Sequence, residues 1–289
     1  MRIADLLAAG PTYSFEFSPP RTPEAEERLQ KTLLELEPLR PSFVSVTYGA
    51  GGTTRDTTRR IVEQIARGTS LTPMPHLTCV AQTRHELEGV VAGYRDLGLE
   101  NLLALGGDPP VDAEDLPSDF TYATELIEVV REVGDFSIGV AAFPEGHPRS
   151  PDLATDRRLL ADKLRLADFG ITQFFFRAAD YFRMVDDLAR LGVDTPVVPG
   201  VMAFVNVDGL RRMAGMNAAA IPDELQERLD RVNGNPPAVR DLAVETSTPL
   251  IAELLAGGAP GVHLYTMNYA TAAKEIWGNL GLPSGRRGG

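Results

Sequence analysis

The first residue that could do chemistry is a glutamate inside an apolar stretch. Glu16 lies in TYSFEFS (residues 12–18), whose alternation is typical of a β-strand, and Pro19 and Pro20 end the segment. An unpaired buried carboxylate is costly, whereas a protonated carboxylic acid is tolerated in apolar surroundings and can act as a general acid. The alternative is a carboxylate that points outward or pairs with an arginine, and Glu16 alone does not decide between the two.

Other residues with polar or special backbone character fall late in strand-like segments or just after them. They are Thr47, Tyr48, His76, Thr78, Gly106, Gly107, Asp108, Phe143, Glu145, His147, Gln173, Tyr265 and Asn268. Most of them also have a plain structural interpretation. An aspartate before two prolines can organise a turn, a buried histidine is often hydrogen-bonded core, and a glutamine can satisfy a buried backbone group.

Eight strand-like segments alternate with longer amphipathic segments of helical periodicity. The strands are predicted at residues 12–18, 43–48, 75–80, 101–107, 136–143, 171–176, 196–202 and 261–267. Eight such units favour an α/β fold of the (β/α)8 TIM-barrel type as a single domain over residues 1–283. Extra helices are expected at about residues 207–256, before the eighth strand, and residues 284–289 are expected to form a disordered tail. In such a barrel the polar residues above converge at the carboxyl ends of the strands, and this convergence favours a functional site.

Composition excludes several classes of function. The chain has 28 Lys and Arg against 40 Asp and Glu, a net charge of −12, which argues against nucleic-acid binding. No apolar run is long enough to span a membrane and no secretory signal begins the chain, so a cytoplasmic protein is expected. The single Cys79 rules out an internal disulfide, and the four histidines lack metal-binding spacing. A Rossmann glycine motif is absent as well.

Several motifs read together resemble the methylenetetrahydrofolate reductase family. They are SFEFSPPRTPEAEERL, FVSVTYGAGG, PHLTCVAQT, NLLALGGDPP, AAFPEGHP, ITQFFF and VVPGVM, in this order between Ser14 and Asn268. The resemblance implies a (β/α)8 barrel that reduces 5,10-methylenetetrahydrofolate to 5-methyltetrahydrofolate with NADH or NADPH. In the usual bacterial members a bound FAD relays the hydride.

The resemblance also implies roles by position. Glu16 matches the general acid and Asp108 the aspartate that contacts the pterin and the developing cation. Gln173 matches a pterin contact, and Tyr265 and Asn268 are also expected to bind substrate. The chemistry agrees, because opening the five-membered ring of the folate to a 5-iminium cation requires a proton at N10.

The flavin positions match the family less well. Gly106 and Asp162 stand where the family has arginines, Leu159 replaces an asparagine, and Phe143 replaces a tyrosine. The residues expected to bind a dinucleotide are Thr47, Tyr48, Ala50, His76, Gly107, Phe143, His147 and Lys163. Losing charged and polar donors weakens pyrophosphate binding. We therefore expect weak or no FAD binding and direct hydride transfer from the nicotinamide.

Alternatives remain open at this stage. They are an FAD-dependent reductase of the same substrate, a non-catalytic folate-binding barrel, and a related pterin as substrate. The sequence does not distinguish NADH from NADPH. It leaves the oligomeric state open, with a homo-oligomer as one alternative.

Overall fold

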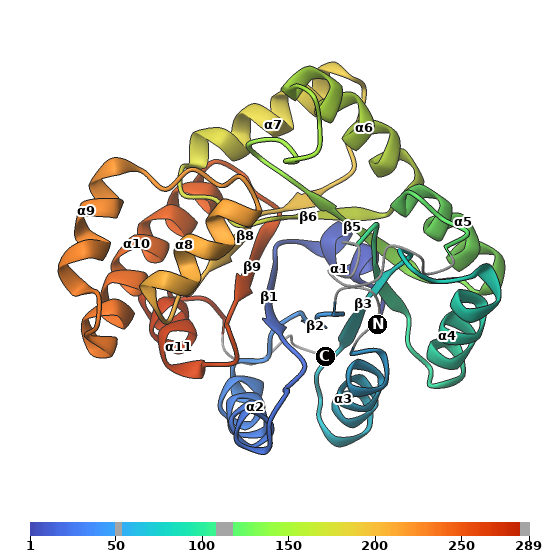
Figure 1. Ribbon diagram of the computed structural model, residues 1–289, viewed down its shortest axis with the longest axis horizontal. Helices are drawn as coiled ribbons and strands as arrows, with labels where there is room; N and C mark the ends of the chain where they lie inside the picture. Colours follow the sequence, from blue (N-terminus) through green and yellow to red (C-terminus); the bar gives the residue numbers. More distant parts are fainter. Residues whose placement is uncertain (50–53, 108–117, 284–289) are drawn as a thin grey trace.

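Parallel β-strands alternate with α-helices along the chain, as the sequence predicts (Figure 1). The structure, a computed structural model, describes residues 1–49, 54–107 and 118–283. The strands are β1 (Thr12–Phe17), β2 (Phe43–Val46), β3 (Pro73–Thr78), β4 (Asn101–Leu105), β5 (Ser137–Ala142), β6 (Phe169–Thr172), β7 (Val197–Val198), β8 (Gly200–Met202) and β9 (Gly261–Tyr265). Their order in the sheet is β7-β6-β5-β4-β3-β2-β1-β9-β8.

The two end members of this order are two halves of one predicted strand, divided at Pro199. β7 pairs with β6, and β8 pairs with β9, so together they close the sheet into a barrel. Proline has no N–H to donate, which interrupts the ladder at this residue. The Pro199 carbonyl still accepts from His263 N at 2.9 Å, and Gly200 N donates to Thr172 Oγ1 at 2.8 Å. The predicted (β/α)8 barrel is confirmed, with its seventh strand broken.

Most helices form the outer layer of the barrel. They are α2 (Pro23–Leu36), α3 (Arg55–Gly68), α4 (Arg84–Asp96), α5 (Ala123–Val133), α6 (Leu153–Leu166), α7 (Ala178–Arg190) and α11 (Ala270–Asn279). The predicted extra helices are α8 (Val207–Met216), α9 (Asp223–Val232) and α10 (Pro236–Ala256), which gather on one side of the barrel (Figure 1). The tail at residues 284–289 lies outside the described residues. In the part of the chain that the structure covers, none of the helices has both the length and the apolar character needed to cross a membrane.

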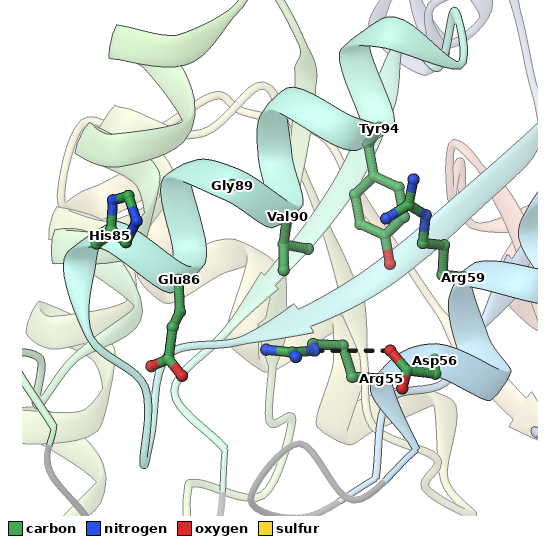
Figure 2. A pocket seen from close by; sticks show the side chains of 8 residues that line it. All are labelled: Arg55, Asp56, Arg59, His85, Glu86, Gly89, Val90 and Tyr94. Atoms are coloured by element: carbon green, nitrogen blue, oxygen red, sulfur yellow. Dashed lines mark ion pairs between the residues drawn. The ribbon is translucent and has the colours of Figure 1, made fainter.

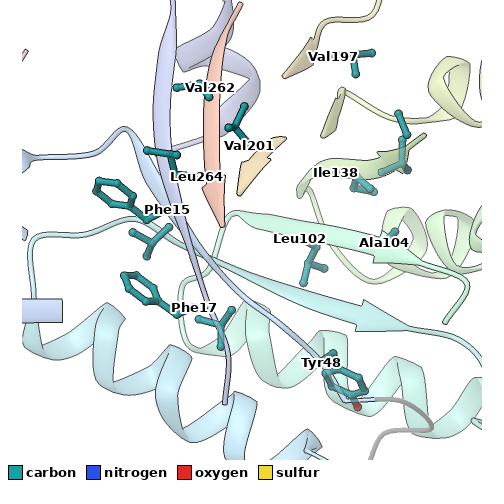
Figure 3. Packing of buried hydrophobic residues seen from close by; sticks show 14 of the residues in the cluster. Phe15, Phe17, Tyr48, Leu102, Ala104, Ile138, Val197, Val201, Val262 and Leu264 are labelled. Atoms are coloured by element: carbon teal, nitrogen blue, oxygen red, sulfur yellow. The ribbon is translucent and has the colours of Figure 1, made fainter. Parts of the chain in front are cut away.

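Strand alternation separates two cores. Phe15 and Phe17 point out of the barrel, are almost fully buried, and join the layer between strands and helices (Figure 3). Residues on the other face of the strands point inward. The barrel interior beneath Glu16, towards the amino-terminal ends of the strands, is filled by Phe43, Met74, Leu103, Phe169, Ile171 and Val198. Glu16 is therefore directed into the barrel while its aromatic neighbours pack outside it.

A short helix, α1 (Ile3–Ala9), closes the amino-terminal end of the barrel. Ile3 is fully buried, and its N–H donates to Asn101 Oδ1 at 2.7 Å. The N–H of Ala4 donates to Ser137 Oγ at 3.0 Å. Asn101 and Ser137 are the first residues of β4 and β5, so these strands satisfy the free N–H groups of the helix. The opposite end of the barrel, where the carboxyl ends of the strands lie, is its mouth, and α1 does not cover it.

Candidate active site

Glu16 lies inside the barrel near the mouth, in contact with three polar side chains. Its Oε2 lies 3.4 Å from Ser45 Oγ, 3.5 Å from His76 Nε2 and 3.6 Å from His263 Nε2. The side chain is only 15% exposed. Its ion-pair partners in the described ranges are these two histidines and not an arginine. The interpretation of Glu16 as an outward or arginine-paired carboxylate is therefore wrong.

His263 is the functional candidate that the sequence analysis missed. The ring is fully buried, with Nδ1 at 2.7 Å from Ser14 Oγ and Nε2 at 3.2 Å from Ser45 Oγ. It also stacks on Phe43 at a centroid distance of 5.8 Å. The parallel register pairs Ser14 with His263 and Glu16 with Tyr265, which brings these side chains to one face. The sequence signal was the alternation within GVHLY, which places His263 and Tyr265 on the same, inward face of the strand.

His76 lies beside Glu16 within the same cluster. Burial lowers the pKa of His76 to about 4, while the Glu16 charge opposes this shift and His263 adds to it. Its Nε2 has no hydrogen-bond partner among the described residues, although Glu16 Oε2 is 3.5 Å away. His76 is therefore neutral near pH 7 and presents a ring nitrogen to the acid.

Tyr265 links Glu16 to the neighbourhood of Gln173. Its hydroxyl donates to the Thr172 carbonyl at 2.6 Å, and burial raises the pKa of Tyr265, with the Glu16 charge adding to the effect. The ring fits because Gly200 has no side chain; a Cβ there would lie 2.6 Å from the Tyr265 ring. Gln173 Oε1 accepts from Phe174 N at 3.0 Å. Its amide nitrogen has no partner among the residues described, so it is available to a ligand.

Asn268 holds the loop that follows β1. Its Oδ1 accepts from Ser18 N at 2.9 Å and its Nδ2 donates to Ser18 O at 2.8 Å. The neighbouring Thr266 Oγ1 donates to the carbonyl of Glu16 at 2.6 Å. The structure thus places Asn268, expected to bind substrate, where it fixes the backbone around Glu16.

The residues expected to bind a dinucleotide do not form a single cluster. Thr47 continues β2 towards the mouth, where its N–H donates to Phe17 O at 2.9 Å. Tyr48 instead belongs to the outer core, and burial raises its pKa to about 12. Gly107 has a φ of 86°, and a Cβ there would lie 2.7 Å from Val80, so glycine is required. Ala50 and Asp108 lie outside the described residues.

Phe143, His147 and Lys163 gather after β5 and on α6. The rings of Phe143 and His147 meet edge to face at 4.5 Å. Lys163 Nζ donates to the Ala141 carbonyl at 2.5 Å, and burial lowers the pKa of Lys163 to about 8. The two rings stand at 68° to each other, so the cluster is aromatic but not flat, and its lysine is directed to the backbone.

Two neighbouring charged residues, Arg157 and Asp162, are also committed to the protein. Arg157 donates to the carbonyls of Phe143 at 3.0 Å and Pro144 at 2.5 Å. Asp162 pairs with Arg165 at 2.6 Å, and Leu159 is exposed without a polar group. A pyrophosphate needs free cationic donors. Lys163 and Arg157 therefore offer few free donors to a pyrophosphate.

The fold and the site together define a class. A closed (β/α)8 barrel that holds a glutamate and two histidines just inside its mouth is a barrel equipped for acid–base chemistry. Solved structures of the same fold include an uncharacterised protein from Clostridium thermocellum described as binding two copies of 5-methyl-5,6,7,8-tetrahydrofolic acid. Its TM-score is 0.69 at 16% identity, over 98% of this chain and 97% of that one.

The family model described as methylenetetrahydrofolate reductase matches residues 2–281. The 5,10-methylenetetrahydrofolate reductase of Pectobacterium carotovorum is 35% identical over 93% of this chain and 90% of its own length. The 5,10-methylenetetrahydrofolate reductase of Escherichia coli is 34% identical over 94% of this chain and 91% of its own length. An Arabidopsis thaliana protein named methylenetetrahydrofolate reductase (NADH) 1 is 34% identical over 97% of this chain and 50% of its own. The chain belongs to the methylenetetrahydrofolate reductase family and is an oxidoreductase, which confirms the expectation from its motifs.

Proposed function

We propose that this protein reduces 5,10-methylenetetrahydrofolate to 5-methyltetrahydrofolate, with hydride passing directly from NADH or NADPH. The observation that carries the proposal is the position of Glu16 inside the mouth, against His76 and His263, in a member of this family. The names of the bacterial relatives support the substrate, and the name of the plant relative supports NADH. Folate and a nicotinamide dinucleotide are thus the proposed partners.

The chemistry has two steps. Protonated Glu16 gives its proton to N10 of the folate, the bond from the methylene carbon to N10 breaks, and a 5-iminium cation forms. A hydride from C4 of the nicotinamide then adds to the methylene carbon, which gives the 5-methyl product and the oxidised dinucleotide. Glu16 regains its proton from solvent. The partly buried site limits water around the cation and strengthens the interactions within it.

The chain's other residues have supporting roles in this proposal. His263 and Ser45 hold the carboxyl group of Glu16, and Gln173 offers its free amide to the pterin. Asp108 is proposed to stabilise the cation, as its match to the family motif implies. Phe143 and His147 would face the nicotinamide ring.

The second candidate is an FAD-mediated reduction of the same substrate in two half-reactions. The commitment of Lys163 and Arg157 to backbone carbonyls favours the flavin-independent route. The test is an anaerobic assay of the purified protein with methylenetetrahydrofolate and NADH, with and without added FAD. We expect turnover without added flavin. Stoichiometric bound flavin, absorbing at about 450 nm, together with turnover that depends on it would establish the second route instead.

A further inference from the structure

A cavity of about 350 Å³ opens between α3 and α4, outside the barrel and separate from the Glu16 cluster. Figure 2 shows its lining. Two arginines of α3, Arg55 and Arg59, one turn apart, face His85 and Tyr94 of α4. The volume is in the range of small-ligand sites, and that of a single water is about 30 Å³.

Tyr94 gives the cavity an unused donor. The residue is 1% exposed, and its hydroxyl has no hydrogen-bond partner among the described residues. Figure 2 shows this hydroxyl directed from α4 towards α3, beside the guanidinium group of Arg59. Burial raises the pKa of Tyr94, so the hydroxyl keeps its proton. A buried hydroxyl without a partner is costly, and an acceptor placed beside it would remove that cost.

Arg59 is an exposed residue whose guanidinium group contacts α4 and not a carboxylate. Its guanidinium lies 3.6 Å from the point where a side chain of Gly93 would begin, so it rests against the bare backbone of α4. Within the described part of the chain Arg59 forms no ion pair. At Gly89, one turn earlier, a Cβ would meet nothing within 4 Å, which leaves the cavity open.

The two carboxylates of the lining do not neutralise this end of the cavity. Glu86 accepts from both the N–H and the hydroxyl of Thr83 at 2.8 Å, which commits it to capping α4. Asp56 is 97% exposed and lies 3.9 Å from Arg55, the outer limit of an ion pair. Arg59 and a phenolic donor therefore remain without a carboxylate partner, and Arg55 has only this long ion pair, so all three can turn to an acceptor with several oxygens.

We propose that the cavity between α3 and α4 is a binding site for a phosphate-type oxyanion, held by Arg59, Arg55 and the hydroxyl of Tyr94. Planar guanidinium groups bind phosphate oxygens with paired hydrogen bonds, and the tyrosine supplies a further donor. α3 begins beyond the carboxyl end of β2, so Arg55 starts from the same end of the barrel as the mouth, whereas Tyr94 lies in the last turn of α4, which runs away from it. Two sources share this chemistry: free phosphate, and the phosphate groups of the nicotinamide dinucleotide.

The first test titrates inorganic phosphate, and separately pyrophosphate, into the full chain by calorimetry at constant ionic strength. Arg59→Gln should weaken binding about tenfold or more, because a charge-assisted contact is lost. Arg60→Gln is the matched control: it removes the same charge from the same helix, but Arg60 pairs with Glu26 at 2.6 Å. Binding should be unchanged there. No phosphate binding, or equal weakening by both variants, overturns the proposal.

Tyr94→Phe tests the hydroxyl itself. Without phosphate the variant should melt at the same temperature as the wild type or higher, because an unpartnered buried hydroxyl is removed. With phosphate it should gain less than the wild type. Phosphate stabilises folded proteins in general by exclusion from their surface, so the difference between the two proteins is the measure. An identical gain in both would exclude Tyr94 and contradict the site.

The source of the anion is found from kinetics. If the site takes the 2′-phosphate of NADPH, Arg59→Gln raises KM for NADPH and leaves KM for NADH unchanged. If it takes a phosphate common to both dinucleotides, both KM values rise. Unchanged KM values with lost phosphate binding assign the site to the free anion. All three results support the site, and the calorimetric test does not depend on the proposed reduction.

Discussion

The imidazole of His263 lies 3.6 Å from the carboxylate of Glu16, across the neighbouring strands β1 and β9. Both side chains point into the barrel because the parallel register places them on one face. The other ring nitrogen contacts Ser14 Oγ at 2.7 Å, which orients the ring. A buried acid is thus held by a histidine that is itself held by a serine. This relationship leads to the first two predictions.

Glu16→Gln should abolish most of the reduction while folate binding survives. The amide has nearly the shape of the carboxyl group but cannot deliver a proton to N10, and general acid catalysis contributes about 10²–10⁴-fold. The measurements are the rate of NADH oxidation with methylenetetrahydrofolate and the dissociation constant of the product folate. Turnover within twofold of the wild type would remove Glu16 from the mechanism.

Ser14→Ala should lower kcat about three- to tenfold with little change in KM, because His263 loses the partner that orients it. The pH dependence of kcat should shift as well, which a purely structural defect would not produce. Ser137→Ala is the control: this serine is also fully buried in the barrel, but it contacts Ala4 N at the closed end. The Ser137→Ala variant should lose stability and keep the kcat and pH profile of the wild type. Equal pH profiles in all three proteins would contradict a positioning role.

His76 should make stability fall as the solution becomes acidic. Burial holds the pKa of folded His76 at about 4, whereas the unfolded chain takes up this proton below about pH 6.5. The unfolded state is therefore favoured progressively between about pH 6.5 and 4, by ~1 kcal/mol per pH unit. Above pH 7 the effect is absent.

His76→Gln removes this contribution, so urea unfolding should depend less on pH across that window. His85→Gln serves as the comparison, because His85 is exposed on α4. That variant should keep the steep wild-type dependence. A slope in His76→Gln that equals the wild-type slope would show that other groups govern acid unfolding.

Gly200→Ala should destabilise the barrel by ~3 kcal/mol or more. The new Cβ would lie 2.3 Å from Thr172 O and 2.6 Å from the Tyr265 ring, at the break in the seventh strand. Gly215→Ala is the counterpart, because it lies within α8 with nothing within 4 Å of its Cβ. It should raise stability by ~0.5–1 kcal/mol. Thermal unfolding of the two variants checks both signs, and a stable Gly200→Ala protein would mean that the strand break can open without cost.

The strands and the inward direction of Glu16 could be predicted because period-two alternation is a local property. The division at Pro199 could not be read from PVVPGVM, since it depends on which neighbour each half pairs with. α1 was not predicted either. It has 7 residues, and its N–H groups depend on Asn101 and Ser137, which are distant in sequence.

The residues of the candidate site also differ in whether the sequence alone could predict them. Glu16, His76 and Gln173 follow from motif and strand position, because each of them lies late in a strand or just beyond it. His263 does not, because its contact with Glu16 is set by the register between β1 and β9, which is tertiary. The commitment of Asn268 to Ser18 likewise appears only when the loop after β1 meets the end of β9.

Closure of the amino-terminal end of the barrel by α1 determines how reactants reach Glu16. With Ile3 sealing the floor of the barrel, molecules reach Glu16 through the mouth. In the proposed reaction a pterin and a nicotinamide, both flat and bulky, enter through this mouth, so they must either stack on each other or bind one after the other. The order of substrate binding, and the release of one product before the next substrate binds, then become part of the turnover cycle.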